Sequence, residues 1–396
     1  MSCDTKNKDG LLYWVWVQQI IGYGSSCVKF FIDNDISARD FYENGKDFWL
    51  SFGMFRKKVK QIDSFSLNEA SKILDECYKS NIEVITYEDK RYPALLKKID
   101  NPPCLVYAKG NLDCLVCDIP VSVVGSRAAT YYGVKIAYNL AYDLSKNNCL
   151  VTSGGALGID TAAHQGALDA DGSTVAILPC GINFKYLMTN EKLREKISRS
   201  GVLLSEYAPD HPMKKFNFHL RNRLISGISL GTIVVEAGKH SGAMITANLA
   251  IEQNRDVFVT PILAQNPLSE GIFALINDGA RVIKSGKDIS EYYKFNKLQN
   301  LSLTLMKNNT KTNIGKNKNT ENFKTENTSL IKNLTENEKL ILGVLKESNC
   351  SIEKIKEDTN LNVSDIFSSI TKMEIRRIIK KLPGKIYKIN TTTFDM

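Results

Sequence analysis

The sequence predicts an α/β protein built on a doubly wound, mostly parallel sheet. From about residue 81 onward, short apolar segments of strand length alternate with helix-like segments, an order typical of a parallel sheet with helices on both faces. Many of these segments are continuous apolar runs, which indicates strands that are buried on both sides. The expected strands cover 84–86, 105–107, 121–124, 150–152, 175–178, 202–204, 232–235, 257–260 and 280–283.

Helices are expected between most of these strands, at 133–145, 160–169, 193–200 and 243–254. The sheet and its helices form the expected core domain, 77–296. Ahead of it, residues 1–76 are expected to form a small helical domain of the SAM or helix–hairpin–helix type. Its turn, Gly22-Tyr23-Gly24, either brings backbone N–H groups to a DNA backbone or simply joins two packed helices. We favour the second interpretation.

The composition changes after the core. Residues 297–334 are rich in Asn, Lys, Thr and Glu and have little to bury, so a disordered linker is expected there. Residues 335–396 show three helical segments and a hairpin with a Pro383-Gly384 turn, the outline of a winged helix. The third helix has no Arg, Asn or Gln cluster suited to reading bases, so docking to a protein is at least as well supported as binding to DNA.

Composition and charge exclude a membrane-spanning helix but say little else about the function. The chain has 396 residues and a net charge of +9, of which six lysines and two glutamates between 306 and 334 supply +4, so overall charge is weak support for a polyanionic partner. No apolar run approaches the ~20 residues that span a bilayer, so we expect a cytoplasmic protein without a membrane partner. Cys114 and Cys117 form a lone CxxC, which predicts reduced thiols and no metal site.

Three glycine-containing turns follow expected strands. They contain Gly125-Ser126-Arg127, Ser153-Gly154-Gly155, and Ser241-Gly242 with Thr246 shortly after. In an open parallel sheet such turns lie side by side at the carboxyl edge, where ligands bind, and N–H groups at helix starts favour phosphates. Arg127 suits this place because its fork bonds two phosphate oxygens at once. A phosphate-bearing ligand is therefore expected.

The turns do not match a cofactor site. Neither the dinucleotide fingerprint nor the phosphate-loop motif is present, so no nucleotide cofactor is expected. Asp160 and His164 lie four residues apart on an expected helix, either as an acid–base pair or in local capping roles. Phe216 and Phe218, interleaved with arginines, are typical of a platform that stacks single-stranded bases, although Phe residues more often belong to a core.

Taken together, these motifs resemble the DprA/Smf family of bacterial DNA-processing proteins. VVGSR, SGGALGIDTAAHQGAL, LLSEYAP, RNRLISGIS, VVEAGKHSGAMITA and LINDGA occur in the family's order. The resemblance implies a helical module, an extended Rossmann-like core and a winged helix. It also implies a homodimeric binding protein, not an enzyme, without cofactor or metal. Such a protein binds single-stranded DNA and loads RecA onto strands covered by single-strand-binding protein in natural transformation.

The resemblance also assigns the DNA contacts. On matching positions they are Gly125, Ser126, Arg127, Ser153, Gly154, Gly155, Arg221, Arg223, Ser241, Gly242 and Thr246, with Phe216 and Phe218 as stacking candidates. The sequence departs from the family pattern at Leu187, His219, Ile262 and 271–273. His219 stands where the family has proline, so it could add a titrating cation at the edge of the groove.

Two rival functions remain open. A nucleotide phosphoribohydrolase of the Lonely-Guy type has a catalytic glutamate close after its glycine turn, whereas this chain has Ala247-Asn248 there. Glu236 and Asp160 are the remaining candidate acids. The other rival is a protein adaptor whose glycine turns are only structural.

Overall fold

The computed structural model describes residues 3–34, 36–51, 59, 61–261, 265–296, 335–347, 350–359, 361–375, 379–382 and 386–389. The chain divides into two compact units, Met1–Ser302 and Leu303–Met396. The expected linker at 297–334, the Pro383-Gly384 turn and Ile262 lie outside the described residues. Within the described residues no helix is both long and apolar enough to cross a membrane.

The first unit contains a nine-stranded sheet in the order β1-β2-β6-β5-β4-β3-β7-β8-β9. The seven strands from β6 to β9 in this order run parallel, and β2 is antiparallel to both of its neighbours. The predicted α/β fold with a mostly parallel sheet is therefore confirmed. The strands are β1 (Glu83–Thr86), β2 (Leu105–Gly110), β3 (Pro120–Val124), β4 (Leu150–Ser153), β5 (Thr174–Leu178), β6 (Val202–Ser205), β7 (Gly231–Val234), β8 (Asp256–Val259) and β9 (Arg281–Val282).

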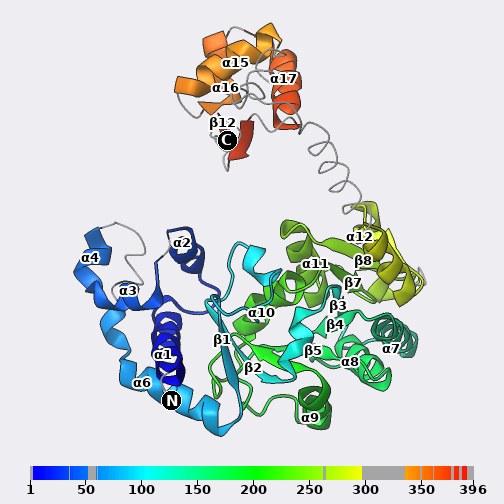
Figure 1. Cartoon of the computed structure of the whole chain (residues 1–396). Helices are drawn as coiled ribbons and strands as arrows, with labels where there is room; N and C mark the ends of the chain where they lie inside the picture. Colours follow the sequence, from blue (N-terminus) through cyan, green and yellow to red (C-terminus); the bar gives the residue numbers. More distant parts are fainter. Residues whose placement is uncertain are drawn as a thin grey trace, which may run out of the picture. The chain divides into compact units, whose positions relative to one another are not determined.

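Helices cover both faces of this sheet (Figure 1). Strand β3 shows the arrangement: Val121 and Val123 pack in the cluster that contains α7 and α8, whereas Val124 packs in the cluster of α10, α11 and α12. Burial on both faces explains why this strand is apolar except at Ser122, whose buried hydroxyl donates to the Ile225 carbonyl oxygen over 2.6 Å. The helices are α7 (Tyr131–Lys146), α8 (Ile159–Asp169), α9 (Glu191–Ser200), α10 (Lys215–Gly227), α11 (Gly242–Glu252) and α12 (Glu270–Asn277).

The N-terminal helices pack onto the edge of the sheet and share one hydrophobic cluster with it. The Nε2 group of Gln18 donates to the Glu206 carbonyl oxygen over 2.9 Å. The Gly24 N–H donates to the Glu206 carboxylate over 2.9 Å. The Gly24 N–H of this turn is thus bonded within the protein, in agreement with the interpretation that the turn joins packed helices. The helices are α1 (Cys3–Ile21), α2 (Cys27–Asp33), α3 (Ala38–Glu43), α4 (Gly45–Ser51) and α6 (Leu67–Lys79).

The second unit has its own hydrophobic core, which includes Ile341, Leu345, Ile366 and Ile370. Its three strands form an antiparallel sheet in the order β10-β12-β11. These are the elements that a winged helix requires, and that identification stays a prediction. The elements are α15 (Glu336–Glu347), β10 (Cys350–Ser351), α16 (Ile352–Thr359), α17 (Val363–Ile375), β11 (Ile379–Leu382) and β12 (Ile386–Ile389).

Candidate functional site

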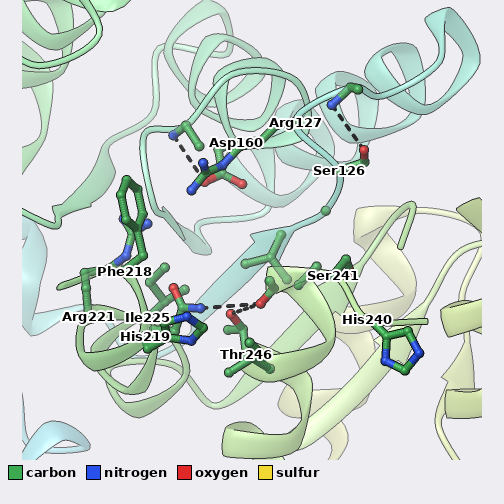
Figure 2. Close-up of a pocket in the computed structure, with 18 of the residues that line it drawn as sticks. Ser126, Arg127, Asp160, Phe218, His219, Arg221, Ile225, His240, Ser241 and Thr246 are labelled. Atoms are coloured by element: carbon green, nitrogen blue, oxygen red, sulfur yellow. Dashed lines mark hydrogen bonds between the residues drawn. The ribbon is translucent and has the colours of Figure 1, made fainter. Parts of the chain in front are cut away.

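A cavity of about 670 Å³ opens at the carboxyl edge of the parallel strands (Figure 2). Strand β3 lies between β4 and β7 in the sheet. The chain runs from β3 to β4 on one side of β3, and from β7 to β8 on the other side. The loops after β3 and β7 therefore diverge, and such a crevice is where open α/β sheets bind ligands. Where the two loops leave the sheet they are still joined, because the Ser126 N–H donates to the Glu236 carbonyl oxygen over 2.8 Å.

The cavity collects positive charge. Among the residues that the structure describes, three cations, Arg127, Lys215 and Arg221, line it together with one carboxylate, Asp160. Sequence reasoning singled out neither Asn222 nor His240 as site residues, yet both line the cavity. Of the predicted contacts, the cavity brings together Gly125, Ser126, Arg127, Phe218, Arg221, Ser241, Gly242 and Thr246.

Arg127 is exposed at this cavity. Its guanidinium carbon lies 4.5 Å from the centroid of the Phe218 ring, a cation–π arrangement that orients the charged group without neutralising it. Phe218 is itself half-buried and packs edge-on against Tyr186, with the ring centroids 5.9 Å apart. A forked, charged donor is thus held in place while its N–H groups remain available to an anion.

Arg221, by contrast, is buried, with only 3% of its surface exposed. Its guanidinium donates to the Gly154 carbonyl oxygen over 2.5 Å and to the carbonyl oxygen of Ile177. A Cβ atom at Gly154 would lie 2.5 Å from the guanidinium, so glycine is needed there to seat the arginine. Burial lowers the pKa of Arg221, and the nearby Asp160 carboxylate opposes this effect.

The turn Ser153-Gly154-Gly155 does not line the cavity. It lies behind Arg221, and the Ser153 hydroxyl donates to the Val123 carbonyl oxygen over 2.7 Å. Gly154 therefore makes room for the Arg221 side chain, not for the close approach of a ligand, and Gly155 adopts a φ of 67° that favours glycine. The contribution of Gly154 to the site is to position Arg221.

Asp160 and His164 do not form a pair with each other. The Asp160 carboxylate accepts the N–H groups of Gly154 and Ala156 over 3.2 and 3.3 Å, and burial raises its pKa. Nδ1 of His164 lies 2.8 Å from the Thr174 hydroxyl. Burial lowers the pKa of His164 to about 3, so this ring is neutral at ordinary pH.

Glu236, the other candidate acid, holds the start of α7. Its carboxylate accepts the backbone N–H of Thr130 over 2.9 Å and the Thr130 hydroxyl over 2.6 Å. The same hydroxyl accepts the Gly133 N–H, which caps the helix. Glu236 is 1% exposed, and its two oxygens are engaged in holding the loop.

Arg223 lies outside the cavity, because the segment 215–227 is a helix. Residues two positions apart on a helix point about 200° away from each other. Arg221 therefore faces the sheet edge, while Arg223 pairs with Glu206 over 2.6 Å beside the N-terminal helices. Phe216 is 65% exposed and does not line the cavity either.

The start of α11 faces the cavity through Ser241, Gly242 and Ala243. The N-cap residue of this helix, Ser241, makes no side-chain capping bond, whereas α7 is capped by Thr130. The first N–H groups of an uncapped helix carry a partial positive charge. Together with the arginines, they make the cavity suited to an anion such as phosphate.

Comparison with known proteins relates the chain to a defined group. The family model for DNA recombination-mediator protein A matches residues 83–294. The DNA processing protein DprA of Streptococcus pneumoniae is 37% identical over 248 residues, which cover 61% of this chain and 82% of that protein. The X-ray structure of that protein superposes with a TM-score of 0.62 at 32% identity, covering 70% of this chain and 96% of that one.

A second solved structure is similar over a shorter part of the chain. It is DNA processing protein A from Helicobacter pylori, described for its single-stranded DNA binding mode. Its TM-score is 0.49 at 31% identity, covering 54% of this chain and 97% of that one.

Proposed function

Because this chain belongs to the family of DNA recombination-mediator protein A, we propose that it binds single-stranded DNA in the cavity at the sheet edge and acts as a recombination mediator. The observation that carries this proposal is the grouping of Arg127, Lys215 and Arg221 at one crevice. A strand's backbone supplies the anions that such a crevice attracts.

The chemistry of the cavity favours recognition of the backbone over recognition of bases. Its donors are arginines, a lysine and the N–H groups at the start of α11, which suit phosphate oxygens. Binding by such groups depends little on base sequence. A strong preference of the chain for one sequence would therefore contradict this mode of binding.

Arg127→Ala tests the proposal most directly, because this side chain is exposed and its loss should not unfold the chain. We expect affinity for oligothymidylate to fall about tenfold, since a charge-assisted hydrogen bond contributes on the order of 1.5 kcal/mol. The dependence of log affinity on log salt should become shallower by about 0.7. Equilibrium titration at several salt concentrations measures both quantities.

The matched control is Arg199→Ala, which removes an exposed arginine from the end of α9. It should leave both the affinity and the salt dependence unchanged. Unchanged binding by a folded Arg127→Ala variant would remove Arg127 from the site.

The specific role proposed for this recombination mediator is to act as a homodimer that loads RecA onto strands covered by single-strand-binding protein in natural transformation. The family's description as recombination mediators supports it. The test is the rate of RecA assembly on such covered strands with and without the chain. A rate that does not increase would leave a DNA-binding protein without the loading function.

The proposal is a binding role without catalysis. Glu236 and Asp160, the acids that a phosphoribohydrolase would use, are engaged with Thr130 and with the turn at 154–156. Release of free base from nucleoside monophosphates would contradict this part of the proposal.

A further inference from the structure

A second hollow, of about 460 Å³, lies between α7 and α8. Its walls include Tyr131, Lys135 and Tyr138 of α7 and Leu157 from the turn before α8. We call these four residues the tyrosine shelf. None of them lines the cavity described above.

The tyrosine shelf presents aromatic surface to solvent. Its residues on α7 are spaced by four and three positions, so they lie on one face of the helix along about 10 Å of its axis. Tyr131 is 84% exposed and Leu157 is 41% exposed, while Tyr138 is half-buried. Large apolar side chains gathered in one exposed hollow mark a binding surface.

The tyrosine shelf continues directly from the cavity. Ala156 lines the cavity and Leu157 lines the shelf, while on the other loop Ala128 lines the cavity and Tyr131 begins the shelf. The Ile159 N–H donates to the Ser126 carbonyl oxygen over 3.2 Å, which fixes the two turns against each other. A chain-like ligand that leaves the cavity here meets the shelf next.

Charge is distributed unevenly along α7. Lys135 lies within the tyrosine shelf and is exposed. Past Tyr138, the Asp169 carboxylate accepts the Tyr138 hydroxyl over 2.9 Å, and Asp171 is paired with Lys146, 3.7 Å away. The tyrosine shelf thus offers a polyanion one cation, Lys135, and has the Asp169 carboxylate beside Tyr138.

We propose that the tyrosine shelf extends the path of the DNA strand: bases of nucleotides that leave the cavity stack on Tyr131 and Tyr138, and Lys135 neutralises the backbone beside them. Rings interleaved with a cation are the chemistry that binds single strands without regard to sequence. The inference rests on the proposed function and adds to it a second site with a different contact, stacking on bases in place of charge on phosphate.

The test compares oligothymidylates of about 6 and about 20 nucleotides, since only the longer strand is expected to leave the cavity and reach the shelf. The full-length double variant Tyr131→Ala, Tyr138→Ala should bind the longer strand at least about fivefold more weakly, given that stacking contributes about 1–3 kcal/mol per base. Its affinity for the shorter strand should stay unchanged. Fluorescence anisotropy of labelled strands measures both affinities.

Two controls separate stacking from other effects. Tyr131→Phe with Tyr138→Phe keeps the rings but loses the hydroxyl that Asp169 accepts, and it should bind both strands as the unmodified chain does. Tyr78→Ala removes an equally exposed tyrosine, 83% exposed on α6, and should have no effect. A long strand that lacks bases beyond its first few nucleotides keeps the backbone contact with Lys135 but loses the stacking, so it should gain less affinity over the short strand than the intact long strand does.

The outcomes distinguish the two proposals. If the unmodified chain binds neither strand, the proposed function fails and the shelf fails with it. If it binds both strands and the double alanine variant binds the long one equally well, only the shelf is wrong. If the double alanine variant keeps its DNA affinity but changes the molecular mass in solution, the shelf contacts protein instead, which also overturns the inference.

Discussion

Two arginines at the cavity carry the same charge in opposite environments. Arg127 is exposed and packs on the Phe218 ring, so its guanidinium can change orientation to contact a bound phosphate group. Arg221 is fixed by two backbone carbonyl groups at the ends of β4 and β5. Replacing Arg127 therefore tests ligand binding with little structural effect, whereas replacing Arg221 would also leave buried carbonyl groups without donors.

His164 makes folding stability depend on pH. Its pKa is about 3 in the folded chain against 6.5 as the ordinary value, so the unfolded chain binds a proton that the folded chain does not. Stability from this site is full above pH 6.5 and is lost as the pH falls toward 3. At pH 5 we expect a loss of about 2 kcal/mol in the free energy of unfolding.

The variant His164→Asn isolates this effect, because its amide can still donate to the Thr174 hydroxyl but does not titrate. Urea unfolding followed by tryptophan fluorescence at pH 7 and pH 5 measures it. All three tryptophans, Trp14, Trp16 and Trp49, lie in the first unit, so the signal reports on the unit that contains His164. Equal losses of stability on acidification in the two chains would refute the prediction.

Among the helices of the sheet domain, α10 and α12 lie outside the ranges expected from the sequence, and α10 is the one that carries site residues. The nine strands and the helices at α7, α8, α9 and α11 were predictable from apolar runs and their spacing. In α10 the buried positions include the polar residues Asn217, Arg221 and Asn222. Their partners are groups elsewhere in the chain, so no apolar helical period is visible in the sequence.

The parts of the site that directly follow strands were predictable from the sequence, whereas the roles of residues with distant partners were not. Gly125–Arg127 and Ser241–Thr246 follow strands, so their meeting at one edge follows from parallel topology. Arg223 and the turn at Ser153–Gly155 were expected at the ligand, but they act inside the protein. Arg223 pairs with Glu206, and the carbonyl oxygen of Gly154 in the turn accepts from Arg221. Neither contact can be predicted from the local sequence.

The pair of Arg223 and Glu206 joins α10 to the end of β6, and the Gly24 N–H of the N-terminal segment donates to the same carboxylate. Their side chains are 7% and 4% exposed and the bonded atoms lie 2.6 Å apart. Glu206→Gln leaves the guanidinium buried without a countercharge, and we expect it to lower the free energy of unfolding by about 3–5 kcal/mol. Urea unfolding followed by tryptophan fluorescence measures this loss.

The exposed pair of Lys29 and Asp100, 3.4 Å apart, provides the control. Asp100→Asn should cost less than about 1 kcal/mol, because surface ion pairs contribute little. Adding Arg223→Met to Glu206→Gln should recover part of the loss, since the uncompensated charge is then gone. A loss for Glu206→Gln no larger than that for Asp100→Asn would contradict a structural role for the buried pair.

At the scale of the whole molecule, the cavity and the tyrosine shelf both belong to the first unit. A chain that ends at Asn296 should therefore bind single strands within about threefold of the full-length affinity, a difference below 1 kcal/mol. Titration with single-stranded and duplex DNA measures the contribution of the second unit. A large loss of single-strand affinity would mean that the C-terminal unit carries part of the site.

The contact between Gly24 and Glu206 limits how the molecule can be rearranged. A chimera that replaced residues 1–76 as a cassette would need a new N–H donor for the Glu206 carboxylate and a new cover for Arg223. Without them, water would reach a pair that holds one face of α10 while the opposite face supports the ligand cavity. The contact of Gly24 with Glu206, the carboxylate that also pairs with Arg223, therefore crosses the expected boundary at residue 76 and ties the two sides together.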